Sequence, residues 1–252
     1  MTRAITVIAN DSLTDEQVEQ AKSIFDKASV SVEWRATADS ESRSRIAAEA
    51  AAQGADVVIG FGGDGTVRAC AEGVTGTDTL LGVIPAGTGN LLARNLGIPS
   101  DLEESITVAL GENVRRLDTG RANGELFAVI AGVGFDAEVM ANTEDAAKDR
   151  VGSLAYFMQG ARHLGDPSFE ARITVAGADM ANGDWATILV GNLSQLQGGV
   201  ELFPDSSPDD GVLDVLGISA DTPLERLAAG LEAALGDGMG EHLIRASGTE
   251  VT

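Results

Sequence analysis

The first half of the chain alternates between short hydrophobic runs and segments whose apolar residues recur at helical spacing. The runs have the length and composition of buried strands and lie at 4–9, 30–35, 56–60 and 81–84. The amphipathic segments lie at 14–28, 42–53, 66–72, 91–96 and 102–110. This strand–helix–strand order predicts a parallel sheet that is covered by helices on both faces.

From Val114 onward short strands dominate the pattern. Strands are predicted at 115–119, 126–131, 169–176, 185–191, 200–203 and 212–218, and helices at 136–164 and 223–235. Asn123-Gly124 and Asn182-Gly183 are typical of hairpin turns. The sequence thus predicts an α/β protein in which residues 1–117 form a parallel-sheet domain. Residues 118–252 are predicted to form an antiparallel, β-rich, sandwich-like domain, with a cleft between the two.

A glycine-rich turn follows the third hydrophobic run. The segment Phe61-Gly62-Gly63-Asp64-Gly65-Thr66 connects that run to a predicted helix. Where a strand enters a helix through glycines, backbone N–H groups point outward together and suit a phosphate. Asp64 adds a carboxylate, which would repel phosphates unless it holds Mg²⁺ or handles a proton. The turn therefore predicts phosphate chemistry that involves a metal ion or an incoming hydroxyl group.

A second turn of the same kind, Pro85-Ala86-Gly87-Thr88-Gly89-Asn90, follows the fourth run. The carboxyl ends of neighbouring parallel strands meet at one edge of a sheet, where open α/β sheets bind their ligands. We therefore expect both turns to face one nucleotide, which makes residues 1–117 the nucleotide-binding domain. A dinucleotide fold of the G-x-G-x-x-G type is disfavoured, because the next strand runs into Pro85 instead of ending in the acid that binds ribose.

These segments resemble a known family. The two glycine turns, together with Leu96-Gly97-Ile98-Pro99, are similar to the diacylglycerol kinase catalytic-domain family, and most of all to its bacterial soluble lipid kinases. The resemblance continues at 118–120, 131–137 and 208–213 and spans roughly residues 56–216. It implies a kinase that uses ATP and Mg²⁺ to phosphorylate a lipid hydroxyl, such as that of diacylglycerol, in an interdomain cleft.

The resemblance also implies roles for individual residues. Asp64 would be the catalytic residue, and Thr37 would contact ATP from the end of the second strand. Thr66, Thr88 and Asn90 are helix-cap candidates that would touch the nucleotide as well. The predicted nucleotide contacts are Thr37, Gly62, Gly63, Asp64, Gly65, Thr66, Val67, Arg68, Gly87, Thr88 and Asn90.

A structural metal site is implied further along the chain. By the resemblance, a Mg²⁺ ion would be held by the Asp210 carboxylate and by main-chain oxygens of Ser207 and Val212. Oxygen ligands of this kind suit a hard cation. By itself the segment 208–211 is typical of a plain turn, so both interpretations stay open.

Two features depart from the family pattern. Members open with Asn-Pro after the first strand, whereas Asn10 is followed by Asp11, an acid that weakens a nucleotide contact. Members also carry an Asp-Gly-Glu or Asp-Gly-Asp segment near the C-terminus, whose last acid is the proposed general base. Gly248-Thr249-Glu250 does not match it. Either the second domain is truncated or the protein lacks this base.

Two alternative functions follow. The first is a nucleotide- or lipid-binding protein without kinase activity, which the missing C-terminal acid favours. The second is an NAD kinase, because those enzymes also carry Gly-Gly-Asp-Gly-Thr. They pair it with an Asn-Glu dipeptide, however, and this sequence contains none.

The charge of the chain limits its partners. The 252 residues include 39 acidic and 17 basic side chains, for a net charge of −22. Nucleic acid is excluded as a partner because it needs basic patches, and contact with an anionic membrane is expected to be transient. ATP and a lipid acceptor are the expected partners, and a homodimer stays open. A single cysteine, Cys70, and the lack of a long apolar run predict a cytoplasmic protein.

Overall fold

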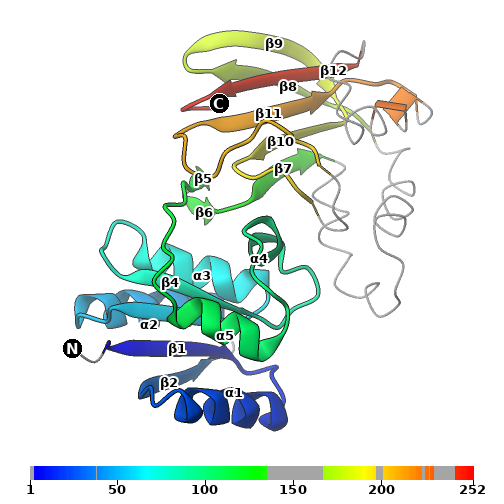
Figure 1. Ribbon diagram of the computed structural model, residues 1–252. Coiled ribbons are helices and arrows are strands. Elements are labelled where there is room, and N and C mark those ends of the chain that lie inside the picture. Colours follow the sequence, from blue (N-terminus) through cyan, green and yellow to red (C-terminus); the bar gives the residue numbers. More distant parts are fainter. Residues whose placement is uncertain are drawn as a thin grey trace. The chain divides into compact units, whose positions relative to one another are not determined.

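The computed structural model describes residues 3–37, 39–134, 167–196, 201–222, 225–226, 228–229 and 242–252 (Figure 1). The chain divides into two compact units, Met1–Arg115 and Arg116–Thr252. Parallel strands and helices make up the first unit and antiparallel strands dominate the second, which confirms the predicted fold class. The domain functions expected from the sequence stay predictions.

The N-terminal unit is built on a four-stranded parallel sheet with the order β2-β1-β3-β4. Its strands are β1 (Ile5–Asn10), β2 (Val32–Thr37), β3 (Val57–Gly62) and β4 (Leu80–Pro85). All three neighbouring pairs are parallel, as the alternation of strands and helices predicts. The carboxyl ends of the strands therefore lie along one edge of the sheet.

Helices connect these strands. They are α1 (Asp15–Lys27), α2 (Ser40–Ala52), α3 (Asp64–Val74), α4 (Leu91–Asn95) and α5 (Leu102–Leu110). The N-terminus of α1 is a capping box: the Thr14 side chain accepts from the Gln17 N–H, and the Gln17 side chain accepts from the Thr14 N–H. The Asp39 side chain caps α2 in the same way by accepting from the Ser42 N–H at 2.7 Å.

Alternate strand residues face opposite helix layers. Val7 and Ile59 pack in one fully buried cluster with side chains of α1 and α5. The adjacent residues Ile8 and Val58 pack in another with side chains of α2 and α3, among them Cys70. Successive strand residues point to opposite faces of the sheet, and both faces are buried. Residues of both orientations are therefore hydrophobic, which gives continuous hydrophobic runs in the sequence. Burial raises the pKa of the Cys70 thiol to about 12, as fits an inert core residue.

The C-terminal unit contains a four-stranded antiparallel sheet with the order β12-β11-β10-β7. These strands are β7 (Ile130–Gly134), β10 (Thr187–Gly191), β11 (Leu213–Ile218) and β12 (Leu243–Gly248). Two hairpins accompany the sheet: β5 (Gly120–Ala122) with β6 (Glu125–Phe127), and β8 (Phe169–Val175) with β9 (Ala178–Trp185). The β8–β9 hairpin packs on the sheet through Trp185, whose ring lies over Gly217 of β11.

Three sequence predictions for this unit are wrong in detail. Residues 115–119 form no strand, because the Asp118 N–H and carboxylate bond to the loop before β11 and not to a ladder partner. The predicted strand at 126–131 is divided between β6 and β7. Asn182-Gly183 is not a turn but lies within β9, and the hairpin turns at Ala176 and Gly177, both with positive φ.

One further turn prediction is confirmed, one strand prediction is wrong, and two helix predictions cannot be compared with described residues. The hairpin turn at Asn123-Gly124 is confirmed. Glu201 makes only an isolated bridge to Gln195, so the described part of 200–203 contains no strand. The helix predicted at 136–164, and most of the one at 223–235, lie outside the described residues.

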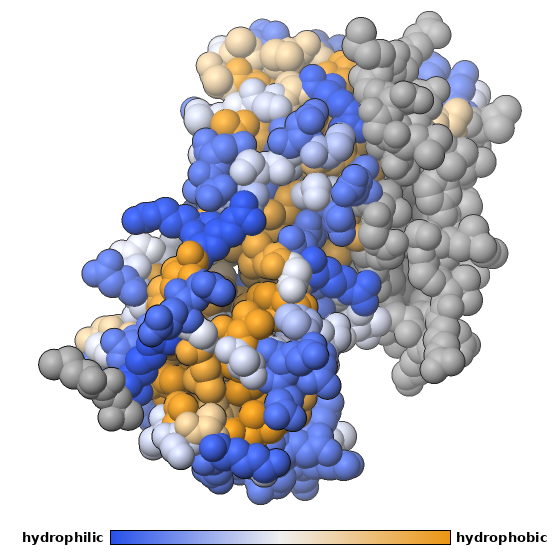
Figure 2. Space-filling model, in the orientation of Figure 1, coloured by the Kyte–Doolittle hydropathy of each residue, from blue (hydrophilic) through white to orange (hydrophobic). Residues whose placement is uncertain are grey.

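On the face shown in Figure 2, hydrophobic patches of the N-terminal unit are bordered by hydrophilic side chains. Among the described residues, no helix has both the length and the apolar character needed to cross a membrane.

Candidate functional site

The carboxyl edge of the parallel sheet collects the polar residues predicted to bind nucleotide. Strand register pairs Thr37 at the end of β2 with Asn10 at the end of β1, and Gly62 at the end of β3 with Pro85 at the end of β4. The two glycine turns continue from β3 and β4. They therefore begin at paired residues of neighbouring strands, as the sequence predicts.

The two glycine turns touch through their backbones. A Cβ atom placed on Gly87 would lie 2.5 Å from Gly63 Cα, and one placed on Gly63 would lie 3.2 Å from Gly87 Cα. The Asn90 side chain fixes the second turn, since it accepts from the Gly87 N–H at 2.9 Å and donates to the Gly87 carbonyl at 2.7 Å. Only glycine at both positions permits this approach.

The first turn opens into α3 without a side-chain cap. Gly63 is the N-cap residue and makes no side-chain cap bond. The N–H groups in the first turn of a helix have no acceptor within the helix, and the helix dipole adds positive potential there. Gly65 lies in this turn, is exposed, and would carry a Cβ atom with nothing within 4 Å. This turn therefore presents backbone donors and open space to an anion.

Thr66 corrects one prediction. It was a candidate N-cap and phosphate donor, but the N-cap is Gly63, and Thr66 is 1% exposed. Its hydroxyl accepts from Asn10 Nδ2 at 3.3 Å, under Gly62, so it ties the end of β1 to α3. The Val67 side chain is also buried. Contacts of these two residues with a nucleotide stay predictions.

Asp64 connects the first turn to α4. Its Oδ1 atom accepts from the Leu91 N–H at 2.6 Å, so the carboxylate caps α4. Of the two cap candidates before α4, Asn90 is the N-cap residue by position, so the prediction for Thr88 as a cap is wrong. Asn90 has a left-handed backbone with φ of 49°, but its side chain makes no cap bond. Gly89 makes room, because a Cβ atom there would lie 2.6 Å from Asp64 Oδ2.

The surroundings of Asp64 disfavour the ionised form of its carboxyl group on balance. Burial raises the pKa of the Asp64 carboxyl, while the backbone N–H of Leu91, the next largest influence, lowers it. The net direction is upward from 3.8. A half-buried carboxylate that pays for desolvation beside helix N-termini is typical of a functional group.

The other predicted contacts lie at the same edge. Thr37 ends β2, and its hydroxyl donates to Asp39 Oδ2 at 3.5 Å. Thr88 is exposed at the tip of the second glycine turn. Arg68 lies one helical turn into α3 and is half-buried. The structure thus brings the predicted nucleotide residues to one edge of one unit, and their roles stay predictions.

The predicted metal loop lies in the C-terminal unit. Asp210 is exposed, and its Oδ1 accepts from the Val212 N–H at 3.0 Å, while Ser207 Oγ donates to Asp209 Oδ1 at 3.1 Å. Asp118 fastens this loop from outside: its Oδ2 accepts from the Gly211 N–H at 2.6 Å, and its own N–H donates to the Pro208 carbonyl at 2.7 Å. Hydrogen bonds from Asp118 therefore hold this loop at Pro208 and at Gly211.

The donor set of this loop suits a hard cation only in part. No group of three or more His, Cys, Asp or Glu side chains placed to share a metal occurs in the part of the chain that the structure describes. A site at Asp210 would use one carboxylate and main-chain oxygens, which Mg²⁺ accepts when water completes its shell. Structural Mg²⁺ at Ser207, Asp210 and Val212 stays a prediction.

Sequence comparisons now give the family. The sequence model of the diacylglycerol kinase catalytic domain matches residues 4–122, and that of the YegS C-terminal NAD kinase beta sandwich-like domain matches residues 128–242. A protein of Pseudomonas syringae pv. syringae (strain B728a), named as a YegS-like lipid kinase, is 31% identical over 216 residues, 84% of this chain and 70% of that protein. The chain belongs to the diacylglycerol kinase-like family of lipid kinases.

Further relatives agree with this family. A protein of Bacillus subtilis (strain 168) named diacylglycerol kinase is 34% identical over 198 residues, 76% of this chain and 64% of that protein. The crystal structure of a diacylglycerol kinase from Bacillus anthracis strain Sterne superposes with a TM-score of 0.76 at 23% identity and covers 99% of this chain and 85% of that one. This structural likeness supports the fold.

Some residues that shape the site of this lipid-kinase family member escaped the sequence analysis. Asn10 drew attention only because an acid, Asp11, follows it, yet its side chain donates a hydrogen bond to the Thr66 hydroxyl. Asp118 was noted only as part of a motif, yet it fastens the 208–212 loop. Their positions at a strand end and beside a Thr-Gly pair were the available signals, but only the fold reveals their partners.

Removing the Asp210 carboxylate tests the predicted metal loop. We expect Mg²⁺ at about ten times its Kd to add about 1.4 kcal/mol to the stability of a folded state that binds it, which raises Tm by about 3 to 5 °C. Asp210→Ala should lose this Mg²⁺-dependent shift. Asp209→Ala, which removes the same charge from the same loop, should keep it.

Melting curves with and without Mg²⁺, at constant ionic strength, measure the shift in the three proteins. A chain of net charge −22 attracts divalent ions non-specifically, so the comparison of the variants decides. An equal shift in all three proteins would mean that the loop is a plain turn.

Proposed function

We propose that this lipid kinase transfers the γ-phosphoryl group of ATP to a lipid hydroxyl, such as that of diacylglycerol. The observation that carries the proposal is the contact between the two glycine turns, with Asp64 bonded across them to the start of α4. Phosphoryl transfer is catalysed mainly by positioning and by stabilisation of charge, and a rigid pair of turns suits both. Diacylglycerol is proposed because the Bacillus subtilis relative is named for it.

The nucleotide phosphates are proposed to bind at the first turn. The N–H groups at the start of α3 supply donors, and Gly65 leaves the approach open. Asn90 keeps Gly87 and its neighbours in one conformation, so little ordering is needed when a ligand binds. Thr37 and Thr88, at the two sides of the edge, are the proposed polar contacts of the rest of the nucleotide.

Asp64 is proposed as the residue that acts on the reacting groups. The bond from the Leu91 N–H fixes one carboxylate oxygen, so the carboxylate keeps one orientation. Asp64 is an oxygen donor of the kind that binds nucleotide-associated Mg²⁺, which when bound would neutralise phosphate charge. The upward direction of its pKa also suits a group that accepts the proton of the lipid hydroxyl.

Gly65→Ala separates binding from folding. Because a Cβ atom there meets no protein atom, we expect Tm to stay equal or to rise, since alanine favours a helix over glycine by about 0.5 to 1 kcal/mol. If phosphates approach this turn, the added methyl group should weaken Mg-ATP binding by about tenfold or more.

Isothermal titration with Mg-ATP measures this effect. Gly183→Ala, where a Cβ atom also has open space but lies in β9, is the control and should bind like wild type. Unchanged Mg-ATP affinity in Gly65→Ala would show that the phosphates do not bind at the start of α3.

A further inference from the structure

Arg43 of α2 is a buried arginine in the N-terminal unit. Its exposure is 6%, and among the described residues of that unit it is the one buried basic side chain. A guanidinium keeps its charge at any physiological pH, and a buried charge is costly unless its donors are matched. Both its Nε and Nη2 atoms donate to the Thr37 carbonyl, at 3.3 and 3.1 Å.

These bonds place the guanidinium at the carboxyl edge of the sheet. Thr37 is the last residue of β2 and pairs in register with Asn10 of β1. Asn10 in turn donates to Thr66, in the helix that follows the first glycine turn. A continuous path of contacts therefore runs from Arg43 through two strand ends to the proposed phosphate site.

The charge of Arg43 also reaches α3. The guanidinium lowers the pKa of the Cys70 thiol, although burial of Cys70 outweighs this influence. Cys70 lies one helical turn after Thr66, in the helix that begins at the glycine turn. Fields of buried charges are weakly screened. In a chain of net charge −22, such a fixed positive charge matters for an anionic ligand.

We infer that Arg43 is a positioning residue for the adenine nucleotide: it holds the end of β2 in its binding conformation and supplies a fixed positive charge to the phosphate side. This inference rests on the proposed function. Arg45 shows the contrast within the same helix, because it is exposed and pairs with Glu49 on the surface at 2.6 Å.

Three variants test the role of Arg43. Arg43→Lys keeps the charge but loses the paired donation to Thr37, and Arg43→Met removes both. Arg45→Met is the matched control. We expect the Kd for Mg-ATP, and the KM for ATP, to rise by about fivefold or more in Arg43→Lys and by more in Arg43→Met. At saturating ATP, kcat and the KM for the lipid should change by less than about twofold. Arg45→Met should match wild type.

Titration with Mg-ATP is performed well below the Tm of each variant, so that folding and binding are separated. If Arg43→Met does not fold, Arg43→Lys decides alone. A folded Arg43→Lys protein with lower Tm and unchanged Kd for Mg-ATP would reduce Arg43 to a structural residue and overturn the inference. If wild type itself does not bind Mg-ATP, the proposed function fails and this inference fails with it.

Discussion

Asp64→Asn should reduce phosphoryl transfer to lipid by at least about 100-fold, because a positioned acid, base or metal ligand contributes about this much or more. Asparagine has nearly the same shape and can still accept the Leu91 N–H bond, which is 2.6 Å long in the wild type. The loss should therefore appear in kcat, while the two glycine turns and the affinity of the first turn for phosphate remain.

The same variant should not be less stable at neutral pH. The pKa of Asp64 is raised from 3.8 mainly by burial, so folding favours the protonated form. Stability from this group is full below pH 3.8 and is lost as the pH rises through the folded pKa. At pH 7 the ionised wild-type carboxylate carries the cost and asparagine does not. We expect the Tm of Asp64→Asn at pH 7 to equal or exceed that of wild type, and the difference to shrink toward pH 4.

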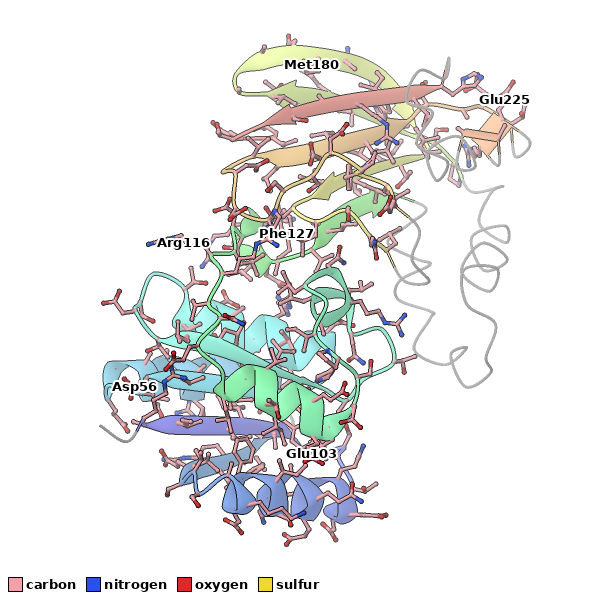
Figure 3. All side chains as sticks on the ribbon, in the orientation of Figure 1. Asp56, Glu103, Arg116, Phe127, Met180 and Glu225 are labelled. Carbon is pink, nitrogen blue, oxygen red and sulfur yellow. The ribbon has the colours of Figure 1, made fainter. Side chains whose placement is uncertain are left out.

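Asp56→Asn is the matched control for this prediction. Asp56 lies just before β3 and accepts from the Ala4 N–H at 2.7 Å. Asp56 therefore lies at the amino end of β3, whereas the first glycine turn follows the carboxyl end of the same strand. Figure 3 shows Asp56 and Glu103, near the start of α5, on opposite sides of the N-terminal unit. Transfer of labelled phosphate and melting curves are measured for all three proteins. Activity of Asp64→Asn within about threefold of wild type would remove Asp64 from the mechanism.

Gly87→Ala should damage both the fold and the site. Its Cβ atom would lie 2.5 Å from Gly63 Cα and 3.1 Å from Asn90 Oδ1, so the two turns must move apart. Overpacking of this kind costs about 1 to 3 kcal/mol, which lowers Tm by about 3 to 10 °C. Because both turns are proposed to hold one nucleotide, Mg-ATP affinity should also fall by about tenfold or more.

Calorimetry and Mg-ATP titration on Gly87→Ala and Gly65→Ala give the comparison. Both variants add one methyl group to a glycine turn, but a Cβ atom on Gly65 has nothing within 4 Å. Only Gly87→Ala should lose stability, and both should lose affinity. If Gly87→Ala keeps the wild-type Tm and Kd, the contact between the turns has no part in binding.

The sequence predicted the N-terminal unit well because each of its local signals has one interpretation. Buried parallel strands give uninterrupted hydrophobic runs, and the Thr14 capping box and the glycine turns mark helix starts. The edge of the sheet that would carry the site follows from parallel order alone, since all carboxyl ends lie together. The candidate site could therefore be located before its atoms were known.

The hydrogen bonds within the site could not be predicted. Thr66 has the composition of a cap, but Gly63 takes that position and Thr66 turns inward to Asn10, a partner 56 residues away. Asp64 caps α4 instead of the helix it begins. Arg43 gave no signal at all, because an arginine in an amphipathic segment is ordinarily a surface residue. Such choices depend on which elements become neighbours.

In the C-terminal unit, the sequence motif for a hairpin turn did not mark the place where the β8–β9 hairpin turns. Asn182-Gly183 is the stronger hairpin motif, yet pairing of Val175 with Ala178 places the turn at Ala176-Gly177. The registers of β8 and β9 depend on the packing of Trp185 against β11, which is a long-range contact. Antiparallel pairs whose order is set by such contacts are less apparent from sequence.

The most direct test of the proposed function is transfer of radioactive phosphate from γ-labelled ATP to diacylglycerol in mixed micelles with Mg²⁺, followed by organic extraction. Wild type and Asp56→Asn should place label in the lipid fraction with matching release of ADP, and Asp64→Asn should not. A panel of sphingoid and isoprenoid alcohols and NAD, tested in parallel, identifies the acceptor if it is not diacylglycerol. Binding of Mg-ATP by wild type without label in any lipid, or with label in NADP alone, would contradict the account.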